Sequence, residues 1–279
     1  MYAYKLPLVG WLGPIVAAVA TLVVPVAPSP APAADVVNQH QVVPAYFYPD
    51  WYNAGNKWYR MCDRMNTVNG PSTAIMNPNS GPGTKANPDY TKVITYCQAK
   101  KQKVVGYVHT SYGARPLSAV KADINRYYTF YPRLNGIFLD EMANDPAKAA
   151  SGAATTRSYY RQLYLYIKAK TAGVEQVIGN PGGAASTAWQ VADPAADIVV
   201  VFEGTAAKYE LWRPPSWVTA RSATRFSHLI YATAPANRQH VCALTRARNA
   251  GYFYVTNDVL PNPWNTLPSY WAQEAPTCR

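Results

Sequence analysis

Three acidic residues at the ends of apolar runs could do chemistry together. Asp140 and Glu141 follow the apolar stretch 137–139, and Glu203 follows the apolar stretch 198–202. Hydrolysis of a glycosidic bond uses a pair of carboxyl groups, one as proton donor and one as nucleophile or base. The apolar residues before Glu203 should desolvate its carboxyl and raise its pKa, which suits a proton donor. The alternatives are that the acidic pair begins a loop or caps a helix, and that Glu203 forms a salt bridge.

Polar and aromatic residues end or follow the other apolar runs. A carbohydrate site requires such groups around one rim, because amides and carboxylates bind hydroxyl groups and rings stack on sugar faces. The candidates for substrate binding are Tyr48, Asp50, Asn77, His109, Tyr112, Asn180, Tyr231, Asn257, Asp258 and Trp264. They could instead finish strands and start turns. Trp264 ends a stiff loop, which predicts either a stacking platform or surface packing. His228, inside a run, is a weaker candidate than His109.

Eight short runs rich in β-branched and aromatic residues alternate with segments that carry apolar residues every three or four positions. The runs cover 43–48, 73–77, 104–109, 136–140, 176–180, 198–203, 226–231 and 252–256, and clear helical spacing covers 90–101, 119–128, 156–170 and 240–250. Strands alternating with helices predict a parallel sheet. Eight such units predict a single (β/α)8 barrel over 43–279, whose active site would lie at the carboxyl ends of the strands. An open doubly wound sheet is the alternative.

The N-terminus has the features of a secretory signal peptide. Lys5 precedes an uncharged stretch over 6–27, which is followed by Pro/Ala-rich sequence and the small-residue triplet 31–33. These features predict a signal peptide over 1–33 and a short leader over 34–42, with an uncleaved anchor as the alternative. We therefore expect a secreted or cell-surface protein with no stable membrane insertion after cleavage.

Composition excludes several classes of protein. Apolar residues make up 49% of the 279-residue chain and charged residues 15%, which excludes general disorder. Lys and Arg number 26 against 15 Asp and Glu, giving a net charge of +11, but the cations are scattered. Specific nucleic-acid binding is therefore not supported. Nothing in the sequence indicates a nucleotide or metal cofactor, and we expect a monomer.

The four cysteines, Cys62, Cys97, Cys242 and Cys278, gain meaning if the protein is exported. An oxidising compartment favours disulfides, and four cysteines allow three connectivities that their order alone does not distinguish. Local pairing, Cys62 with Cys97 and Cys242 with Cys278, is the hypothesis we favour because each pair closes a short loop. Free buried thiols are the alternative, and no Cys/His spacing resembles a zinc site.

Four segments resemble the spherulin-4 family. They read GYVHTSYG at 106–113, GIFLDEM at 136–142, SHLIY at 227–231 and GYFYVTND at 251–258, and the similarity runs in order from about Pro44 to Trp271. The resemblance implies a (β/α)8 glycoside hydrolase, whose characterised fungal members cleave α-1,4-linked N-acetylgalactosamine stretches. It further implies that Asp140, Glu141 and Glu203 match the essential acids of the family.

These implications predict a secreted, endo-acting and retaining hydrolase of a polysaccharide that contains α-linked N-acetylgalactosamine or galactosamine. By analogy with retaining barrels of the α-galactosidase type, Asp140 would be the nucleophile and Glu203 the acid/base. The alternative is a non-catalytic carbohydrate-binding or cell-envelope protein on the same barrel. The net charge of +11 opposes a cationic, deacetylated polymer. Either the cleft is locally acidic, or the substrate is acetylated or another polymer.

We expect the exported protein to begin near Ala34 and to contain no free thiol, because signal peptidase cleaves after small residues and export oxidises thiols. Non-reduced peptide mapping of the secreted protein should find Cys62 linked to Cys97 and Cys242 linked to Cys278. A peptide joining Cys62 to Cys242, or four alkylatable thiols, would contradict the pairing, and an N-terminal peptide from residues 1–30 would contradict cleavage.

Overall fold

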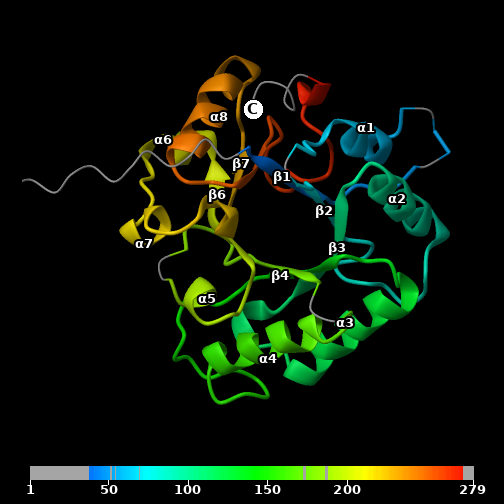
Figure 1. The fold of residues 1–279 in the computed structure, drawn as a ribbon, viewed down its shortest axis with the longest axis vertical. Helices are drawn as coiled ribbons and strands as arrows, with labels where there is room; N and C mark the ends of the chain where they lie inside the picture. Colours follow the sequence, from blue (N-terminus) through cyan, green and yellow to red (C-terminus); the bar gives the residue numbers. More distant parts are fainter. Residues whose placement is uncertain are drawn as a thin grey trace, which may run out of the picture. The chain divides into compact units, whose positions relative to one another are not determined.

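Eight parallel strands close into a barrel. The computed structural model describes residues 38–272 except 51, 54, 69, 172–173 and 186–187. The strands are β1 His40–Ala45, β2 Thr73–Met76, β3 Lys103–His109, β4 Gly136–Asp140, β5 Gln176–Gly179, β6 Ile198–Thr205, β7 Phe226–Tyr231 and β8 Tyr252–Val255. Each strand pairs with the next and β8 pairs with β1 (Figure 1). The predicted barrel is therefore confirmed, and the open sheet is excluded.

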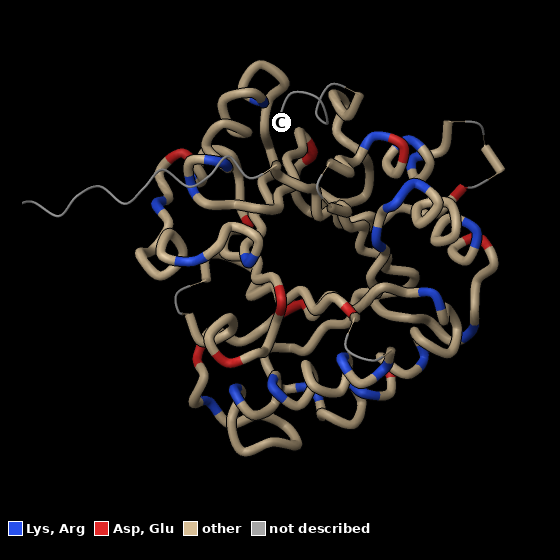
Figure 2. Tube along the Cα trace, in the orientation of Figure 1, with Lys and Arg blue, Asp and Glu red and all other residues tan. Residues whose placement is uncertain are grey.

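Helices follow the strands and surround the barrel. They are α1 Lys57–Arg64, α2 Pro88–Ala99, α3 Leu117–Phe130, α4 Thr156–Lys168, α5 Trp189–Ala192, α6 Ala206–Leu211, α7 Ser216–Thr219 and α8 Arg238–Ala247, with short 3-10 turns at Ser111–Gly113, Ala223–Arg225 and Pro235–Asn237. Local sequence starts several of them: Asn56 caps α1, Asn87 caps α2 just before Pro88, and Thr155 forms a capping box on α4. Lysines and arginines are frequent along the outer helices α3 and α4 (Figure 2).

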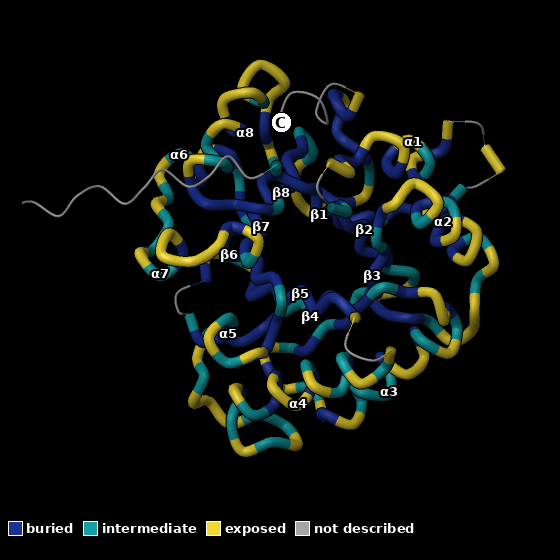
Figure 3. Tube along the Cα trace, viewed as in Figure 1, coloured by how far each residue is buried: buried dark blue, intermediate teal, exposed yellow. Residues whose placement is uncertain are grey.

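Burial follows the expected layers, with buried strands and helices that expose their outer sides (Figure 3). Close contact between the layers requires small residues at some outward positions of the strands. A Cβ atom on Gly106 of β3 would lie 2.7 Å from the ring of Tyr127 on α3, so glycine lets this helix pack directly on the strand.

The first strand begins three residues earlier than the sequence predicted. His40 pairs with Tyr252 of β8, and its N–H donates to the Gly251 carbonyl, so 40–42 belong to the barrel and not to a leader. The polar residues there are buried but satisfied: the Gln41 side-chain oxygen accepts hydrogen bonds from Asn66 N–H and the Ser72 hydroxyl. Polar composition concealed this part of the strand because side-chain hydrogen bonds offset its burial.

One of the two predicted disulfides lies within the described residues. Cys62 on α1 and Cys97 on α2 are bonded, with Cα atoms 5.1 Å apart, which confirms this pair. Cys242 is buried on α8, but its predicted partner Cys278 lies outside the described residues. The predicted signal peptide and its alternative as an anchor also lie outside them. No helix within the described part of 38–272 is long and apolar enough to span a membrane.

His228 of β7 belongs to the outer core and not to the barrel interior. It is fully buried between the strand and α6, where its Nδ1 lies 2.7 Å from the Tyr209 hydroxyl and its ring packs edge-on against Trp212. Burial, helped by the Arg248 charge, lowers the pKa of His228 to about 3. This histidine is a neutral core residue, as most strand histidines are.

Acid should therefore destabilise the protein through His228. Below its ordinary pKa of about 6.5 the unfolded chain binds a proton that the folded chain excludes, so the free energy of unfolding falls as pH drops from about 6.5 towards 3. The loss should approach ~4 kcal/mol for this residue. Urea unfolding between pH 7 and 4 should show a shallower pH dependence in His228→Gln. The exposed His240→Gln is the control, and an unchanged slope in His228→Gln would contradict the assignment.

Candidate active site

A bulge in β6 turns Glu203 into the barrel. Val200 pairs with Ser227 of β7, but the next paired residue is Phe202, so Val201 is an extra residue and the alternation shifts by one. Paired residues point to the same side of a sheet, so Glu203 points to the same side as Val200, although they are three residues apart. Phe202 points outward, where it packs against Tyr209 of α6. Plain alternation from Val200 would have sent Glu203 outward.

The loop after β5 stabilises this irregular part of β6. The Val201 carbonyl accepts a hydrogen bond from Ala185 N–H, and Glu203 N–H donates to the Gly183 carbonyl. Backbone groups that the bulge removes from regular pairing thus find partners in the loop 181–185. The same loop contains Gly182, whose N–H donates to the side-chain oxygen of Asn180 at 3.0 Å.

Asn180 joins the two acids of the site. Its side-chain nitrogen donates to Asp140 Oδ1 at 2.9 Å and to Glu203 Oε2 at 2.7 Å. Two oxygens bound to one nitrogen cannot lie farther apart than the sum of these two distances, so the carboxyls of Asp140 and Glu203 are close neighbours. The structure therefore brings Asp140, Asn180 and Glu203 together at the carboxyl ends of three neighbouring strands.

Burial dominates the electrostatics of the pair. Desolvation, with the nearby Asp140 charge, raises the pKa of Glu203 to about 7, although hydrogen bonds from Asn180 and Trp264 oppose the shift. Desolvation also raises the pKa of Asp140, while hydrogen bonds from the Tyr107 hydroxyl and Asn180 act in the opposite direction. Two carboxyls this close titrate as a pair, and a single proton shared by the pair lies mainly on Glu203, because Glu203 accepts fewer hydrogen bonds than Asp140.

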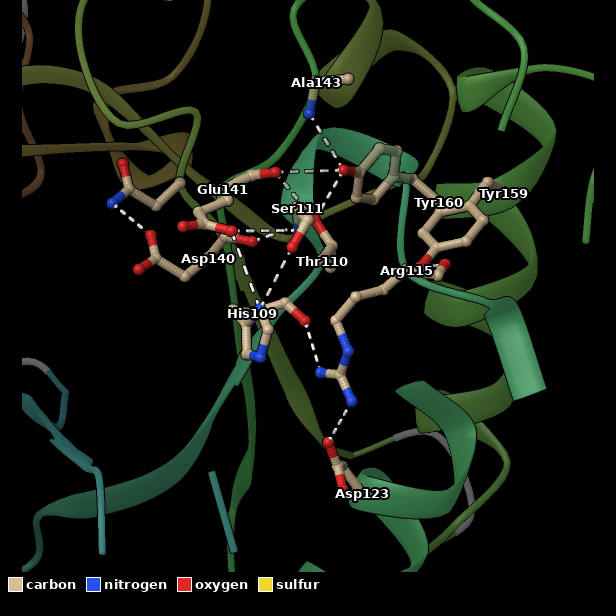
Figure 4. Close-up of polar contacts among 11 residues, drawn as sticks. His109, Thr110, Ser111, Arg115, Asp123, Asp140, Glu141, Ala143, Tyr159 and Tyr160 are labelled. Carbon is tan, nitrogen blue, oxygen red and sulfur yellow. Dashed lines mark hydrogen bonds and ion pairs between the residues drawn. The ribbon is translucent and has the colours of Figure 1, made fainter. Parts of the chain in front are cut away.

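Glu141 faces away from this pair. Its backbone is left-handed, with φ of 52°, and its carboxylate accepts a hydrogen bond from Ser111 N–H at 3.1 Å (Figure 4). Its Oε2 also lies 3.7 Å from His109 Nδ1. Asp140 thus points towards β5 and β6, while the half-exposed Glu141 side chain lies against the end of β3.

Tyr112, Tyr231 and Tyr48 lie at different depths around the mouth. Tyr112 is 47% exposed, and desolvation together with the charges of all three acids raises the pKa of its hydroxyl, so this hydroxyl lies near the acids. Tyr231 is half-buried, edge-on to Trp264. Tyr48 is exposed, with its hydroxyl bonded to Asp89 at 2.5 Å near the start of α2. Asp140, Glu141 and Glu203 are not among the groups that shift the pKa of the Tyr48 hydroxyl, which responds to Asp89 and its neighbours instead.

Two predicted substrate ligands brace loops instead. The Asn77 side-chain oxygen accepts from Gly81 N–H at 2.9 Å, and that of Asn257 accepts from Ser269 N–H at 2.8 Å. Asp50 and Asp258 are partly buried in the loops that follow β1 and β8, and Asp258 Oδ1 accepts a hydrogen bond from Val259 N–H. Asn77 and Asn257 act as the turn residues that the alternative interpretation described.

The expectation that Trp264 is a stacking platform is wrong in this structure. Its side chain is only 7% exposed, packs against Tyr231 and Tyr254, and hydrogen bonds Glu203. The stiff loop places the indole inside the rim of the barrel. There its N–H donates a hydrogen bond to Glu203, and Tyr231 and Tyr254 cover the ring. Trp264 thus belongs to the site as a hydrogen-bond donor.

Tyr107 was not predicted to bind substrate, although its hydroxyl hydrogen bonds Asp140. It lies two residues before His109 on β3 and so points to the same side of the barrel, with its ring edge-on to Tyr46. Alternation counted back from His109 would have identified it. The sequence did not predict a role for Thr110 and Ser111 either, because their contacts with Glu141 depend on how the loop after β3 packs against the loop after β4.

The fold is a closed (β/α)8 barrel with two carboxyls that share one amide at the carboxyl ends of its strands. A solved structure with this fold is Aspergillus clavatus Sph3 in complex with GalNAc, which is 22% identical and has a TM-score of 0.70. The match covers 86% of this chain and 97% of that one. Spherulin-4 of Physarum polycephalum is 34% identical over 246 residues, 84% of this chain and 68% of that protein. The profile of spherulation-specific family 4 matches residues 41–277. The chain belongs to the spherulin-4 family, as its motifs predicted.

Glu203 should cost stability when it is ionised. Its pKa in the folded chain is about 7, above the usual 4.5, so stability is fully present below about pH 4.5 and is lost as pH rises through 7. Glu203→Gln should therefore raise the free energy of unfolding at pH 8.5 by about 3 kcal/mol and change it little at pH 4.5. Thermal unfolding at the two pH values measures this, and equal effects at both would contradict the raised pKa.

Proposed function

We propose that the protein is a secreted, endo-acting, retaining glycoside hydrolase of a polysaccharide that contains α-linked N-acetylgalactosamine or galactosamine. The observation that carries the proposal is the Asn180 side-chain nitrogen that binds both Asp140 and Glu203. This contact supports retention, because it brings an oxygen of each carboxyl to one shared amide nitrogen, as the close approach of a nucleophile and an acid/base requires.

Asp140 is assigned as the nucleophile. Hydrogen bonds from Tyr107 and Asn180 stabilise its ionised form against the desolvation that raises its pKa. Its carboxylate attacks the anomeric carbon, the glycosidic C–O bond breaks, and a covalent glycosyl-enzyme forms.

Glu203 is assigned as the acid/base. With a pKa of about 7 it carries a proton in mildly acidic solution and gives it to the leaving glycosidic oxygen. In the second step it takes a proton from water, whose oxygen attacks the glycosyl-enzyme and releases Asp140. Glu141, with a side chain that is 40% exposed, would bind a substrate hydroxyl or amide group.

The amino-sugar substrate is supported by likeness and by charge. Sph3, the structural relative, was solved with GalNAc. The mouth of the barrel collects three carboxyls, whereas lysines and arginines are frequent on the outer helices α3 and α4 (Figure 2). This cluster of carboxyls supports a locally acidic cleft, which would accept a cationic polymer despite the net charge of +11.

Incubation of the protein with a panel of acetylated and partly deacetylated galactosamine polymers and neutral polysaccharides, followed by mass analysis of soluble products, tests the function. We expect internal cleavage of an amino-sugar polymer and loss of turnover in Asp140→Asn and Glu203→Gln by at least about 1000-fold. Circular dichroism should show both variants folded. Binding without release of oligosaccharides by the wild type would instead support a non-catalytic carbohydrate-binding protein, and wild-type turnover by either variant would remove that residue from the mechanism.

Retention predicts the configuration of the first product. Two displacements at the anomeric carbon restore its configuration, so an α-linked substrate should release the α-anomer before mutarotation. Proton NMR in the first minutes of hydrolysis distinguishes the anomers. Initial release of the β-anomer would mean that water attacks directly and that Asp140 acts as its base.

A further inference from the structure

The turn between Asp140 and Glu141 is strained and needs a restraint. Glu141 has φ of 52°, in the left-handed region, which costs a residue with a long side chain on the order of 1–2 kcal/mol. A regular continuation of β4 would point Glu141 away from the barrel interior, because neighbouring strand residues alternate. The turn keeps both carboxyls at the mouth and aims only Asp140 at Asn180.

A chain of buried hydroxyls holds the carbonyl groups of this turn (Figure 4). The Thr110 hydroxyl lies 2.8 Å from the Glu141 carbonyl oxygen and 3.0 Å from that of Asp140. It lies 2.7 Å from the Tyr160 hydroxyl, which in turn accepts a hydrogen bond from Ala143 N–H at 3.0 Å. Thr110 and Tyr160 are both fully buried.

The hydrogens of this chain can be placed in one consistent direction. Ala143 N–H donates to the Tyr160 oxygen, the Tyr160 hydroxyl donates to Thr110, and the Thr110 hydroxyl donates to the Glu141 carbonyl. Burial raises the pKa of Tyr160 to about 12, so the phenol keeps its proton in neutral solution. Tyr160 thus connects α4 to both ends of the segment 141–143, through Thr110 and through its own hydroxyl, which lies 3.4 Å from the Glu141 carbonyl oxygen.

We propose that Tyr160, acting through Thr110, is a positioning residue that holds the left-handed turn at Glu141 and thereby keeps Asp140 against Asn180 and Glu203. Tyr160 is buried behind the turn and reaches the reacting groups only through it. The inference rests on the proposed function for its effect on catalysis, but its effect on the carboxyl pair does not depend on any substrate.

Tyr160→Phe removes the shared hydroxyl and leaves the ring, and Tyr159→Phe is the matched control. Tyr159 is the neighbouring residue, is equally buried, and uses its hydroxyl to bind the Arg115 carbonyl at 2.9 Å, outside the chain described above. We expect Tyr160→Phe and Thr110→Val to lower kcat by about 10- to 100-fold with KM within about threefold, because a displacement near 1 Å has that effect. Thr110→Ser should recover most of the activity, and Tyr159→Phe should stay within about threefold of the wild type.

A second measurement does not need turnover. Carbon NMR of labelled glutamate carboxyls should show the titration of Glu203 in Tyr160→Phe moved down from that of the wild type, because a displaced Asp140 charge raises it less. An unchanged titration together with unchanged kcat, or equal losses in Tyr159→Phe, would overturn the proposal. If the wild type hydrolyses nothing in the polysaccharide panel, the proposed function fails, while the titration still decides whether Tyr160 positions the pair.

Discussion

The site depends on one amide nitrogen that binds two carboxyls in a desolvated barrel mouth. Asn180 can do this because its own position is fixed: its backbone N–H donates to the Leu139 carbonyl, its carbonyl accepts from Met142 N–H, and its side-chain oxygen accepts from Gly182. Both hydrogens of the side-chain nitrogen are therefore directed at Asp140 and Glu203. A shared donor between two acids lowers the cost of bringing them together, and the remaining cost appears as raised pKa values that leave a proton available.

Two backbone irregularities make this contact possible. In β6 an extra residue, Val201, reverses the alternation and turns Glu203 inward, and after β4 the left-handed Glu141 keeps the chain from continuing as a strand. Each irregularity is held by hydrogen bonds from a neighbouring loop, 181–185 in the first case and 110–112 in the second. Strain beside a reacting group persists only where the surroundings hold it, and both loops provide such support.

These features also explain how far the sequence could lead. Its periodicity predicted eight strands, the barrel, and the strand ends that carry Asp140 and Glu203, because apolar runs and their polar ends are local properties. It could not show the bulge, since the run 198–202 is apolar on both faces and gives no alternation to interrupt. Nor could it show that Asn77 and Asn257 turn their side-chain oxygens to their own loops, while Asn180 directs its nitrogen to the acids. Those orientations depend on which N–H groups the folded loops leave near each oxygen.

The distribution of charge indicates what kind of transition state the mouth can stabilise. Beyond desolvation, the groups that shift the pKa values of Asp140 and Glu203 are other carboxyls, a tyrosine, an indole, an amide and one backbone N–H, and none is a cation. Tyr46 and Tyr107 have hydroxyl pKa values raised by burial and by these carboxyls, so they remain neutral donors. A site for an anionic group would place lysine or arginine at its centre. Because no cation is among these groups in the described part of the chain, the pair of Asp140 and Glu203 suits a sugar ring that becomes positive as its glycosidic bond breaks. The net positive charge of the chain therefore says little about its substrate, because the groups that act on these two acids are carboxyls and neutral donors.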